Sequence, residues 1–174
     1  MDLFIEKLTG TDEKNLYKFE RENRNFFEET VPTRGDNYYK PEVFKKRHAM
    51  LLEEQAEGIS YFYLIKDENG SILGRINVVD IDMTHGIANL GYRVGHLHTG
   101  KGVAKKALEL LLETVAQLNI KQLKAMTTTN NMASRKVLEK NGFEQTACVD
   151  EEFDMNGQKL KFVHYIWNSK DSRY

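Results

Sequence analysis

The stretch Thr99-Gly100-Lys101-Gly102-Val103-Ala104 joins an alternating apolar run at residues 88–94 to a long helical pattern that begins near Val103. Two glycines at a strand-to-helix turn expose consecutive backbone N–H groups and let a ligand approach the main chain closely. The positive end of the following helix points at the same place, and the small side chain of Ala104 keeps its first turn uncrowded. We therefore predict that this turn binds the phosphate or pyrophosphate of an anionic cofactor.

Two other phosphate-binding loops do not match this turn. A Walker A loop needs a Lys-Ser or Lys-Thr pair after the second glycine, and Gly102 is followed by Val103. A Rossmann fingerprint needs three glycines near the start of a βαβ unit. A plain tight turn is the alternative for an isolated Gly-x-Gly pair. The strand before the turn and the amphipathic helix after it favour the anion site.

The composition indicates one globular domain. A length of 174 residues predicts a single domain over residues 1–174, and a hydrophobic content of 40% with nine Phe and eight Tyr is enough for a core. The net charge of −1 argues against a nucleic-acid-binding or anionic-membrane-binding surface. We expect neither nucleic acid nor membrane as a partner, and we leave open a monomer or a homodimer.

The single cysteine and the N-terminal segment bear on the compartment. Cys148 is the only cysteine, so it forms no internal disulfide, which fits a reducing compartment. It has no nearby histidine in the sequence, which argues against a catalytic role. The first seven residues lack the basic start and apolar core of a signal peptide, and no apolar run approaches membrane-spanning length. We expect a soluble, cytoplasmic protein.

The pattern of strands and helices predicts a mixed α/β domain. Predicted strands cover residues 4–8, 59–66, 72–82, 88–94 and 123–128, with a local break at Gly74. A final strand pair, from Phe143 onward and over residues 160–167, surrounds the turn at Asn156-Gly157. Residues 23–39 show no regular pattern. The order β-α-α-β-β-β-α-β-α-β-β indicates a central sheet that is not doubly wound.

Four helices are predicted between these strands. Thr11 or Asp12 would cap the first, and Pro41 would open the second. Asn130 or Asn131 would cap the last, which stops at Asn141-Gly142. Two of the helices carry one-sided stripes, formed by Phe44, His48, Leu51 and Gln55 in the second and by Ala104, Leu108, Leu111, Val115 and Leu118 in the third.

Several motifs in order resemble the GNAT family of acyl-CoA-dependent N-acetyltransferases. They are Gly91-Tyr92-Arg93-Val94, the turn at residues 99–104, Asn131-Met132-Ala133-Ser134 and Glu139-Lys140-Asn141-Gly142-Phe143. The resemblance covers nearly the whole chain. It implies a single GNAT-type domain with a central, mixed, mostly antiparallel twisted sheet flanked by helices. The chain departs from the family at Thr99, where Gln or Arg is usual.

The resemblance implies acetyl-CoA as co-substrate and no metal. It assigns cofactor contacts to Tyr92, Val94, Thr99, Gly100, Lys101, Gly102, Val103, Ala104 and Asn131. The pantetheine would lie along the strand that ends at Val94, and Asn131 would bind the pantetheine arm. Helix capping is the alternative for Asn131, and a single side chain would not easily do both. His96 and His98 suggest a metal pair, but no third ligand stands at metal spacing.

Acetyl transfer to an amine needs a neutral amine, an aligned carbonyl, a stabilised oxyanion and a proton for the leaving thiolate. The resemblance implies that Ser134 supplies this proton, and a first-turn role in its helix is the alternative. It also implies that Glu152 accepts the proton of the amine. Glu152 is equally consistent with a solvated strand-edge charge, together with Asp150 and Glu151.

Residues 22–26 and 31–34 are similar to the RimJ/RimL branch, the ribosomal-protein N-terminal acetyltransferases, and in particular to the alanine-specific type. The acceptor implied is a protein N-terminus, with contacts from Glu22, Glu28, Glu29 and Arg34. The three glutamates are equally consistent with solvated helix-end charges. A small amine such as a polyamine or aminoglycoside is the alternative acceptor. A module that holds acyl-CoA or associates with the ribosome without turnover is the alternative outside enzymes.

Overall fold

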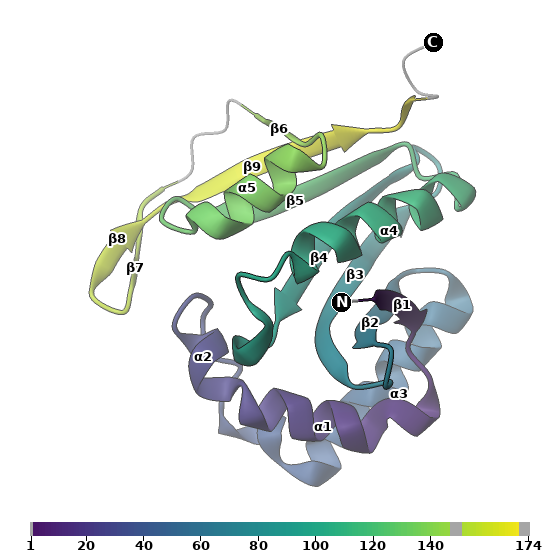
Figure 1. The fold of residues 1–174 in the computed structure, drawn as a ribbon, viewed down its shortest axis with the longest axis vertical. Coiled ribbons are helices and arrows are strands. Elements are labelled where there is room, and N and C mark those ends of the chain that lie inside the picture. The colour runs from purple at the N-terminus through teal and green to yellow at the C-terminus, as the bar shows by residue number, and fades with distance from the viewer. Residues whose placement is uncertain (1, 147–150, 171–174) are drawn as a thin grey trace.

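The computed structural model describes residues 2–146 and 151–170, and it shows a mixed sheet with helices on both faces (Figure 1). The seven strands of this sheet lie in the order β1 (Leu3–Lys7), β2 (Tyr61–Asp67), β3 (Ile72–Asp82), β4 (Ile87–Val94), β5 (Gln122–Thr128), β9 (Phe162–Asn168) and β6 (Glu144–Gln145). The helices are α1 (Glu13–Glu22), α2 (Arg24–Glu28), α3 (Pro41–Glu57), α4 (Val103–Gln117) and α5 (Met132–Lys140). Short 3-10 turns lie at Gly10–Asp12, Asp36–Tyr39 and His96–His98, and β7 (Phe153–Met155) with β8 (Gln158–Leu160) forms a separate hairpin.

The pairing of β4 with β5 is the parallel one, whereas the other paired strands run antiparallel. It extends over three positions, Ile87↔Gln122, Ala88↔Leu123 and Asn89↔Lys124. Beyond these positions the two strands diverge, as Figure 1 shows. In the part of the chain that the structure describes, the second half of β4, from Leu90 to Val94, therefore has β3 on one edge and no paired strand on the other.

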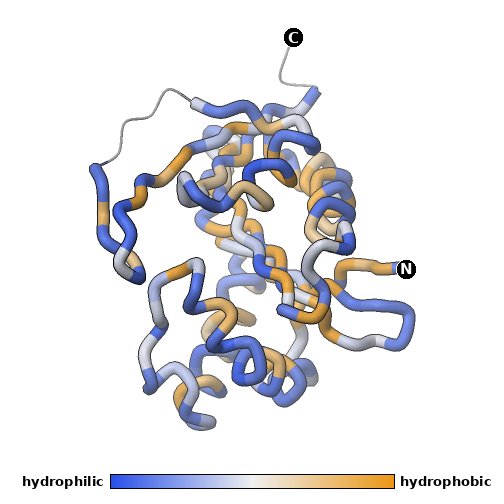
Figure 2. The backbone as a smooth tube through the Cα atoms, turned by 60° about the vertical axis from the view of Figure 1, so that its left-hand side comes forward, coloured by the Kyte–Doolittle hydropathy of each residue, from blue (hydrophilic) through white to orange (hydrophobic). Residues whose placement is uncertain are grey.

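Two hydrophobic clusters cover the two faces of the sheet. The α4 face carries the larger cluster, which includes Ile65, Ile76, Leu108, Leu111 and Leu123. The other face packs against α1 and α3, in a cluster that includes Leu16, Phe19, Phe44, Phe62 and Leu64. Figure 2 shows hydrophobic stretches concentrated inside the molecule and hydrophilic residues along the outer loops. Alternation along β2 explains this arrangement, since successive side chains point to opposite faces.

One buried acidic side chain ties α1 to the sheet. Glu20 has no exposed surface, and its two carboxylate oxygens lie 2.8 Å from Nη1 of Arg75 and 3.4 Å from Nη1 of Arg93. The two arginines are direct cross-strand neighbours on β3 and β4. A buried charge needs such partners, because the loss of one partner leaves an uncompensated ion in a low-dielectric interior.

The predicted break at Gly74 is confirmed. A register shift between Ile65 and Lys66 lies opposite this part of β3, and a Cβ at Gly74 would collide with the carbonyl oxygen of Arg93. The one-sided face of α3 is confirmed as well. Its Gln55 donates to the carbonyl of Leu8 and accepts from the N–H of Phe62.

Two predictions about helix ends and stripes need correction. Asp12 does occupy the N-cap position of α1, but its side chain forms a capping box with Thr9, and Thr11 is not the cap. Ala104 belongs to the surface of a cavity rather than to the core, because the buried stripe of α4 begins with Val103 and continues through Ala107.

The last part of the chain also differs from the prediction. The turn at Asn156-Gly157 does join a hairpin, but its second strand ends at Leu160 and a new strand, β9, begins at Phe162. Residues 160–167 are therefore not one strand. The predicted irregular segment at residues 23–39 contains the short helix α2. Cys148 and Asp150 lie outside the described residues. No described helix combines the length and apolar character that crossing a membrane requires.

Candidate active site

A cavity of about 710 Å³, here called the main cavity, opens where β4 and β5 diverge. β4 contributes residues 90–94 to it, and β5 contributes residues 125–128. Further lining comes from the glycine turn with the start of α4, from α5 as far as Leu138, and from the segment at and after α2. Because the separated strands leave backbone groups unpaired by a sheet neighbour, an extended ligand arm can pair with β4 here.

The glycine turn forms one end of the main cavity. Gly100 and Gly102 have φ angles of +73° and +77°, and a Cβ at either position would meet no atom within 4 Å. The first N–H groups of α4 are not capped by a side chain, so they are open to a ligand. Every residue predicted to bind cofactor lines the cavity except Lys101, which is exposed.

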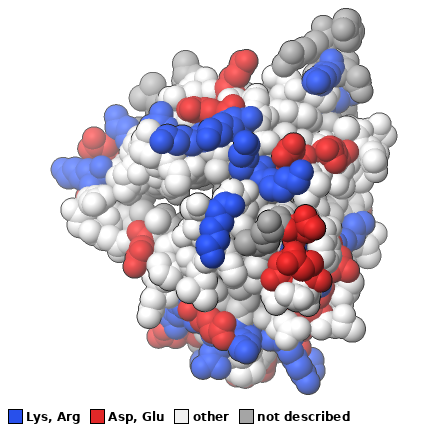
Figure 3. All heavy atoms as spheres, viewed as in Figure 1, with Lys and Arg blue, Asp and Glu red and all other residues white. Residues whose placement is uncertain are grey.

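Basic side chains surround this end of the cavity. Figure 3 shows Lys and Arg gathered over α5 and the first part of α4. The exposed lysines of these elements and the glycine turn are Lys101, Lys105, Lys106, Lys136 and Lys140. They add positive potential to the uncapped helix end, which suits a ligand with several phosphate charges.

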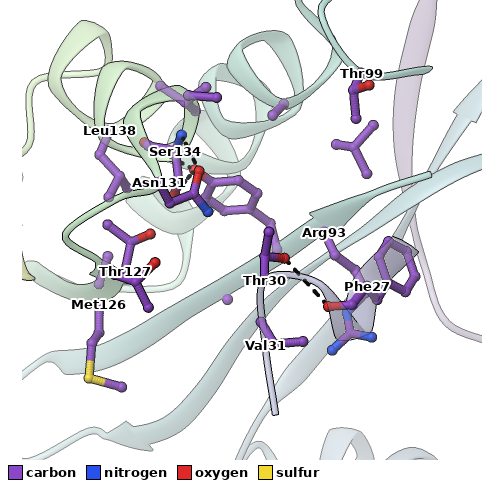
Figure 4. A pocket seen from close by; sticks show the side chains of 18 of the residues that line it. Phe27, Thr30, Val31, Arg93, Thr99, Met126, Thr127, Asn131, Ser134 and Leu138 are labelled. Atoms are coloured by element: carbon purple, nitrogen blue, oxygen red, sulfur yellow. Dashed lines mark hydrogen bonds between the residues drawn. The ribbon is translucent and has the colours of Figure 1, made fainter. Parts of the chain in front are cut away.

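Two residues that line the main cavity bring their hydroxyl groups together, and one of them, Ser134, is labelled in Figure 4. The hydroxyl of Tyr92 on β4 is 2.9 Å from Oγ of Ser134 on α5, and it is 3.3 Å from the carbonyl oxygen of Ser134. Burial raises the pKa of Tyr92, and the hydrogen bond with Ser134 opposes that effect. The phenol therefore stays protonated at neutral pH and can donate.

Asn131 performs the capping role that sequence analysis considered unfavourable alongside cofactor binding. Its Oδ1 accepts from the backbone N–H of Ser134 at 3.1 Å, and so caps α5. The cap uses only the oxygen of the amide, and Asn131 still lines the main cavity. Ser134 is not the cap of this helix, which leaves its hydroxyl directed to Tyr92.

Sequence analysis missed Arg93 and the aromatic residue beneath it. The Arg93 guanidinium lies 4.7 Å from the centre of the Phe27 ring, and both residues line the main cavity (Figure 4). Burial is the main cause that lowers the pKa of Arg93, followed by the charge of Arg34. The only sign of this arrangement in the sequence was one arginine, Arg75 or Arg93, on each of two consecutive predicted strands. Their acidic partner Glu20 is 55 positions from Arg75, so no local pattern connects it to them.

The predicted acceptor residues do not line the main cavity. Glu22 is exposed and lies 3.9 Å from Lys18. Glu28 accepts from Arg24 at 3.0 Å and from Thr33 at 2.6 Å, and the Thr33 bond is the main cause that lowers its pKa. Glu29 is exposed. Arg34 contacts a different, smaller cavity, described below.

The part of the main cavity beside α2 and the β7–β8 hairpin is largely apolar, with hydroxyl groups from Thr30, Thr127 and Thr128. α2 and the segment after it supply Phe26, Phe27, Val31 and Pro32, and the other wall comes from Met126, Phe153, Met155 and Phe162. The rings of Phe153 and Phe162 stack with 4.6 Å between centroids. Asn156, at the tip of the β7–β8 hairpin, donates to the carbonyls of Glu28 at 3.3 Å and Glu29 at 3.1 Å. The hairpin is thereby fastened to the end of α2.

Glu152 and the two histidines fall at the margins of the site. Glu152 is exposed and precedes Phe153, which lines the cavity while Glu152 does not. His98 lines the cavity, and His96 packs against Phe26 with 4.6 Å between ring centres. Within residues 2–146 and 151–170, no group of three or more His, Cys, Asp or Glu is placed to hold a metal ion.

Comparisons with known proteins agree with this geometry. The sequence model of the GNAT acetyltransferase domain matches residues 2–144. A probable N-acetyltransferase, YjcK of Bacillus subtilis, is 27% identical over 158 residues, which cover 89% of this chain and 87% of the relative. The chain therefore belongs to the GNAT acetyltransferase family and is an acetyl-CoA-dependent N-acetyltransferase.

Solved structures confirm the fold. The ribosomal-protein-S5-alanine acetyltransferase of Vibrio fischeri superposes with a TM-score of 0.89 at 20% identity, covering 98% of this chain and 95% of that one. The spermidine N-acetyltransferase of Vibrio cholerae, solved with CoA and spermine, gives a TM-score of 0.78 at 18% identity, with 95% of each chain covered. The predicted mixed, mostly antiparallel sheet flanked by helices is confirmed.

The glycine turn gives a direct test of the cofactor site. We expect Gly102→Val to abolish acetyl-CoA binding, because the new side chain enters the cavity and strains a left-handed backbone by about 1–2 kcal/mol. Isothermal titration calorimetry measures the binding, and circular dichroism checks that the fold persists.

Gly70→Val is the matched control for this variant. Gly70 has a φ of +79° and open space around its Cβ position, but it lies in the turn between β2 and β3, away from the main cavity. The control carries similar backbone strain, so we expect it to keep normal acetyl-CoA affinity. Unchanged affinity in Gly102→Val would remove the turn from the cofactor site.

Proposed function

We propose that this enzyme acetylates the α-amine of a protein N-terminus, most closely the alanine-initiated type found on ribosomal proteins. The observation that carries this proposal is the chemistry of the acceptor side of the main cavity. Among the described residues that line it, apolar and aromatic side chains predominate, together with Arg93 and the hydroxyl groups of Thr30, Thr127 and Thr128, and there is no carboxylate. The likeness to the Vibrio fischeri alanine acetyltransferase supports the same acceptor class.

The lining disfavours polyamines and aminoglycosides as acceptors. These molecules carry several ammonium groups, and each buried ammonium needs a carboxylate or equivalent partner to offset its desolvation. A peptide N-terminus brings a single ammonium, which must lose its proton before it reacts. The carbonyls of the following residues can accept from the Arg93 guanidinium, which donates and does not accept.

The residues of the main cavity have separable roles in this proposal. Bound acetyl-CoA supplies a thioester, so that a C–N bond to the amine forms, the C–S bond breaks, and the thiolate takes up a proton. The uncapped end of α4 and the glycine turn hold the phosphates, and the free edge of β4 together with Asn131 holds the pantetheine arm. In this proposal the Tyr92 hydroxyl, 2.9 Å from Oγ of Ser134, is the donor of their hydrogen bond, which leaves the Ser134 proton for the thiolate.

In this proposal Glu152 accepts the proton of the amine through a water molecule. Its side chain is exposed and it directly precedes Phe153. A peptide α-amine has a pKa near ~8, so a strong base is not required. The supporting observation is sequence proximity to the cavity wall, since the side chain itself stays outside the lining.

Release of free CoA tests the acceptor class. We expect purified protein with acetyl-CoA and an alanine-initiated basic peptide to release thiol rapidly, and the same peptide with a blocked N-terminus to release none. Spermidine and an aminoglycoside should react at least about tenfold more slowly, since one unpaired buried charge costs more than 1.4 kcal/mol. The assay reads kcat/KM from thiol appearance.

Two outcomes would overturn this acceptor assignment. Faster turnover of spermidine than of the peptide would show that the acceptor is a small amine. Tight acetyl-CoA binding with no release of free CoA in the presence of any peptide or amine would indicate a module that binds acyl-CoA without turnover.

The pH dependence of two variants separates the proton donor from the proton acceptor. We expect Ser134→Ala to lower kcat about a hundredfold at every pH, because the thiolate loses its donor. Glu152→Gln should lower kcat/KM below the amine pKa of ~8 and recover above it, because the free amine is then already neutral. Rates measured between pH 6 and 10, with the affinity for acetyl-CoA alongside, show both effects.

Tyr92→Phe is the mechanistic partner of Ser134→Ala. If Tyr92 acts by orienting Ser134, the double variant should be no slower than Ser134→Ala alone. Ser71→Ala, at an exposed turn, controls for loss of a hydroxyl. An unchanged rate in Ser134→Ala would return Ser134 to a structural role, and a pH-independent effect of Glu152→Gln would remove Glu152 from proton transfer.

A further inference from the structure

A second, smaller cavity of about 90 Å³ lies on the α1–α3 face of the sheet. Arg75 and Asn77 of β3 form its base, His48 and Arg47 of α3 form one side, and Arg34 and Tyr38 close it from the loop before α3. None of these residues lines the main cavity. The space equals about three water volumes, enough for a group of a few heavy atoms.

Three residues that line this cavity each carry one buried polar side-chain atom with no hydrogen-bond partner among the described residues. The atoms are Nδ1 of His48, Nε of Arg75 and Oδ1 of Asn77. The His48 and Arg75 residues are only 5% and 6% exposed. Such atoms cost free energy when they are buried unpaired, so three around one cavity indicate a polar ligand rather than a packing gap.

The hydrogen-bonding roles of these atoms can be assigned. Nε2 of His48 lies 2.9 Å from the carbonyl oxygen of Thr9, so Nε2 carries the proton and donates. In the neutral ring Nδ1 is then an acceptor, as is Oδ1 of Asn77. Nε of Arg75 is a donor. The Tyr38 hydroxyl accepts from Nη1 of Arg34 at 2.5 Å, so its own proton is available to a ligand.

The cavity carries an excess of positive charge. Three arginines line it, and no carboxylate does so among the described residues. The nearest acidic partner, Glu20, is bound to Nη1 of Arg75 and is shared with Arg93. Both Arg34 and Arg47 also lie over the ring of Tyr38, at 4.8 and 5.7 Å from its centre. An anion is the ligand that this field favours.

We propose that the second cavity binds a protonated phosphate group, either hydrogenphosphate itself or the phosphate of a phosphomonoester. The oxygens of this group accept from Arg75, Tyr38 and the two outer arginines. Its hydroxyl donates to Nδ1 of His48 or Oδ1 of Asn77. Sulfate is also a tetrahedral anion, but it has no proton at neutral pH. It therefore leaves both Nδ1 of His48 and Oδ1 of Asn77 without a hydrogen-bond donor.

Calorimetric titration of the protein with phosphate tests this site. The titration is run with CoA present at saturation, which blocks the glycine turn of the main cavity. We expect one phosphate per chain, bound about tenfold more tightly than sulfate at equal ionic strength, since one hydrogen bond to a charged group is worth about 1.5 kcal/mol. Methyl phosphate in place of phosphate distinguishes a monoester from the free ion.

Two variants locate the site. Arg47→Gln should weaken both anions about tenfold, whereas Lys45→Gln, an exposed change on the same helix, should weaken neither. Asn77→Leu removes one acceptor, so it should reduce the preference for phosphate over sulfate while sulfate binding reports that the site is intact. Equal affinities for the two anions in the unmodified protein, or a phosphate signal that disappears when CoA is added, would overturn the proposal.

Discussion

Strands β4 and β5 pair in parallel through three positions only, from Ile87↔Gln122 to Asn89↔Lys124, and then separate. Parallel pairing requires a crossover, and α4 supplies it, so the same connection that separates the strands also directs its uncapped N-terminus toward the gap. The main cavity, the free edge of β4 and the position of the glycine turn are consequences of this one arrangement. Side chains from α5 and α2 then complete the site.

The buried cluster of Glu20, Arg75 and Arg93 connects the two cavities. Glu20 lies between the arginines, one of which lines the main cavity and the other the second cavity. Loss of one member of a buried ion group is strongly destabilising, because it leaves an uncompensated charge in the interior. The cluster therefore fixes the position of α1 against β3 and β4, and with it the place of Arg93 in the wall of the main cavity.

Local patterns predicted most of the fold, because alternation in strands and three-to-four spacing in helices report burial directly. The end of the cavity that we propose for the cofactor was predictable for the same reason, since Gly100, Gly102 and the start of α4 are adjacent in the sequence. The end that we propose for the acceptor was not, because it is assembled from distant segments. Glu28 pairs with Arg24 and Thr33, Arg34 turns to the second cavity, and Phe153 and Phe27 form the wall in their place.

Amide hydrogen exchange with and without acetyl-CoA tests the central claim that the free edge of β4 holds the co-substrate. If it does, binding should slow exchange at residues 90–94 and 102–105, because those N–H groups gain partners. Residues 61–67 of β2, already paired on both edges, should not change. Protection confined to other segments, with exchange at residues 90–94 unaltered by saturating acetyl-CoA, would contradict the account.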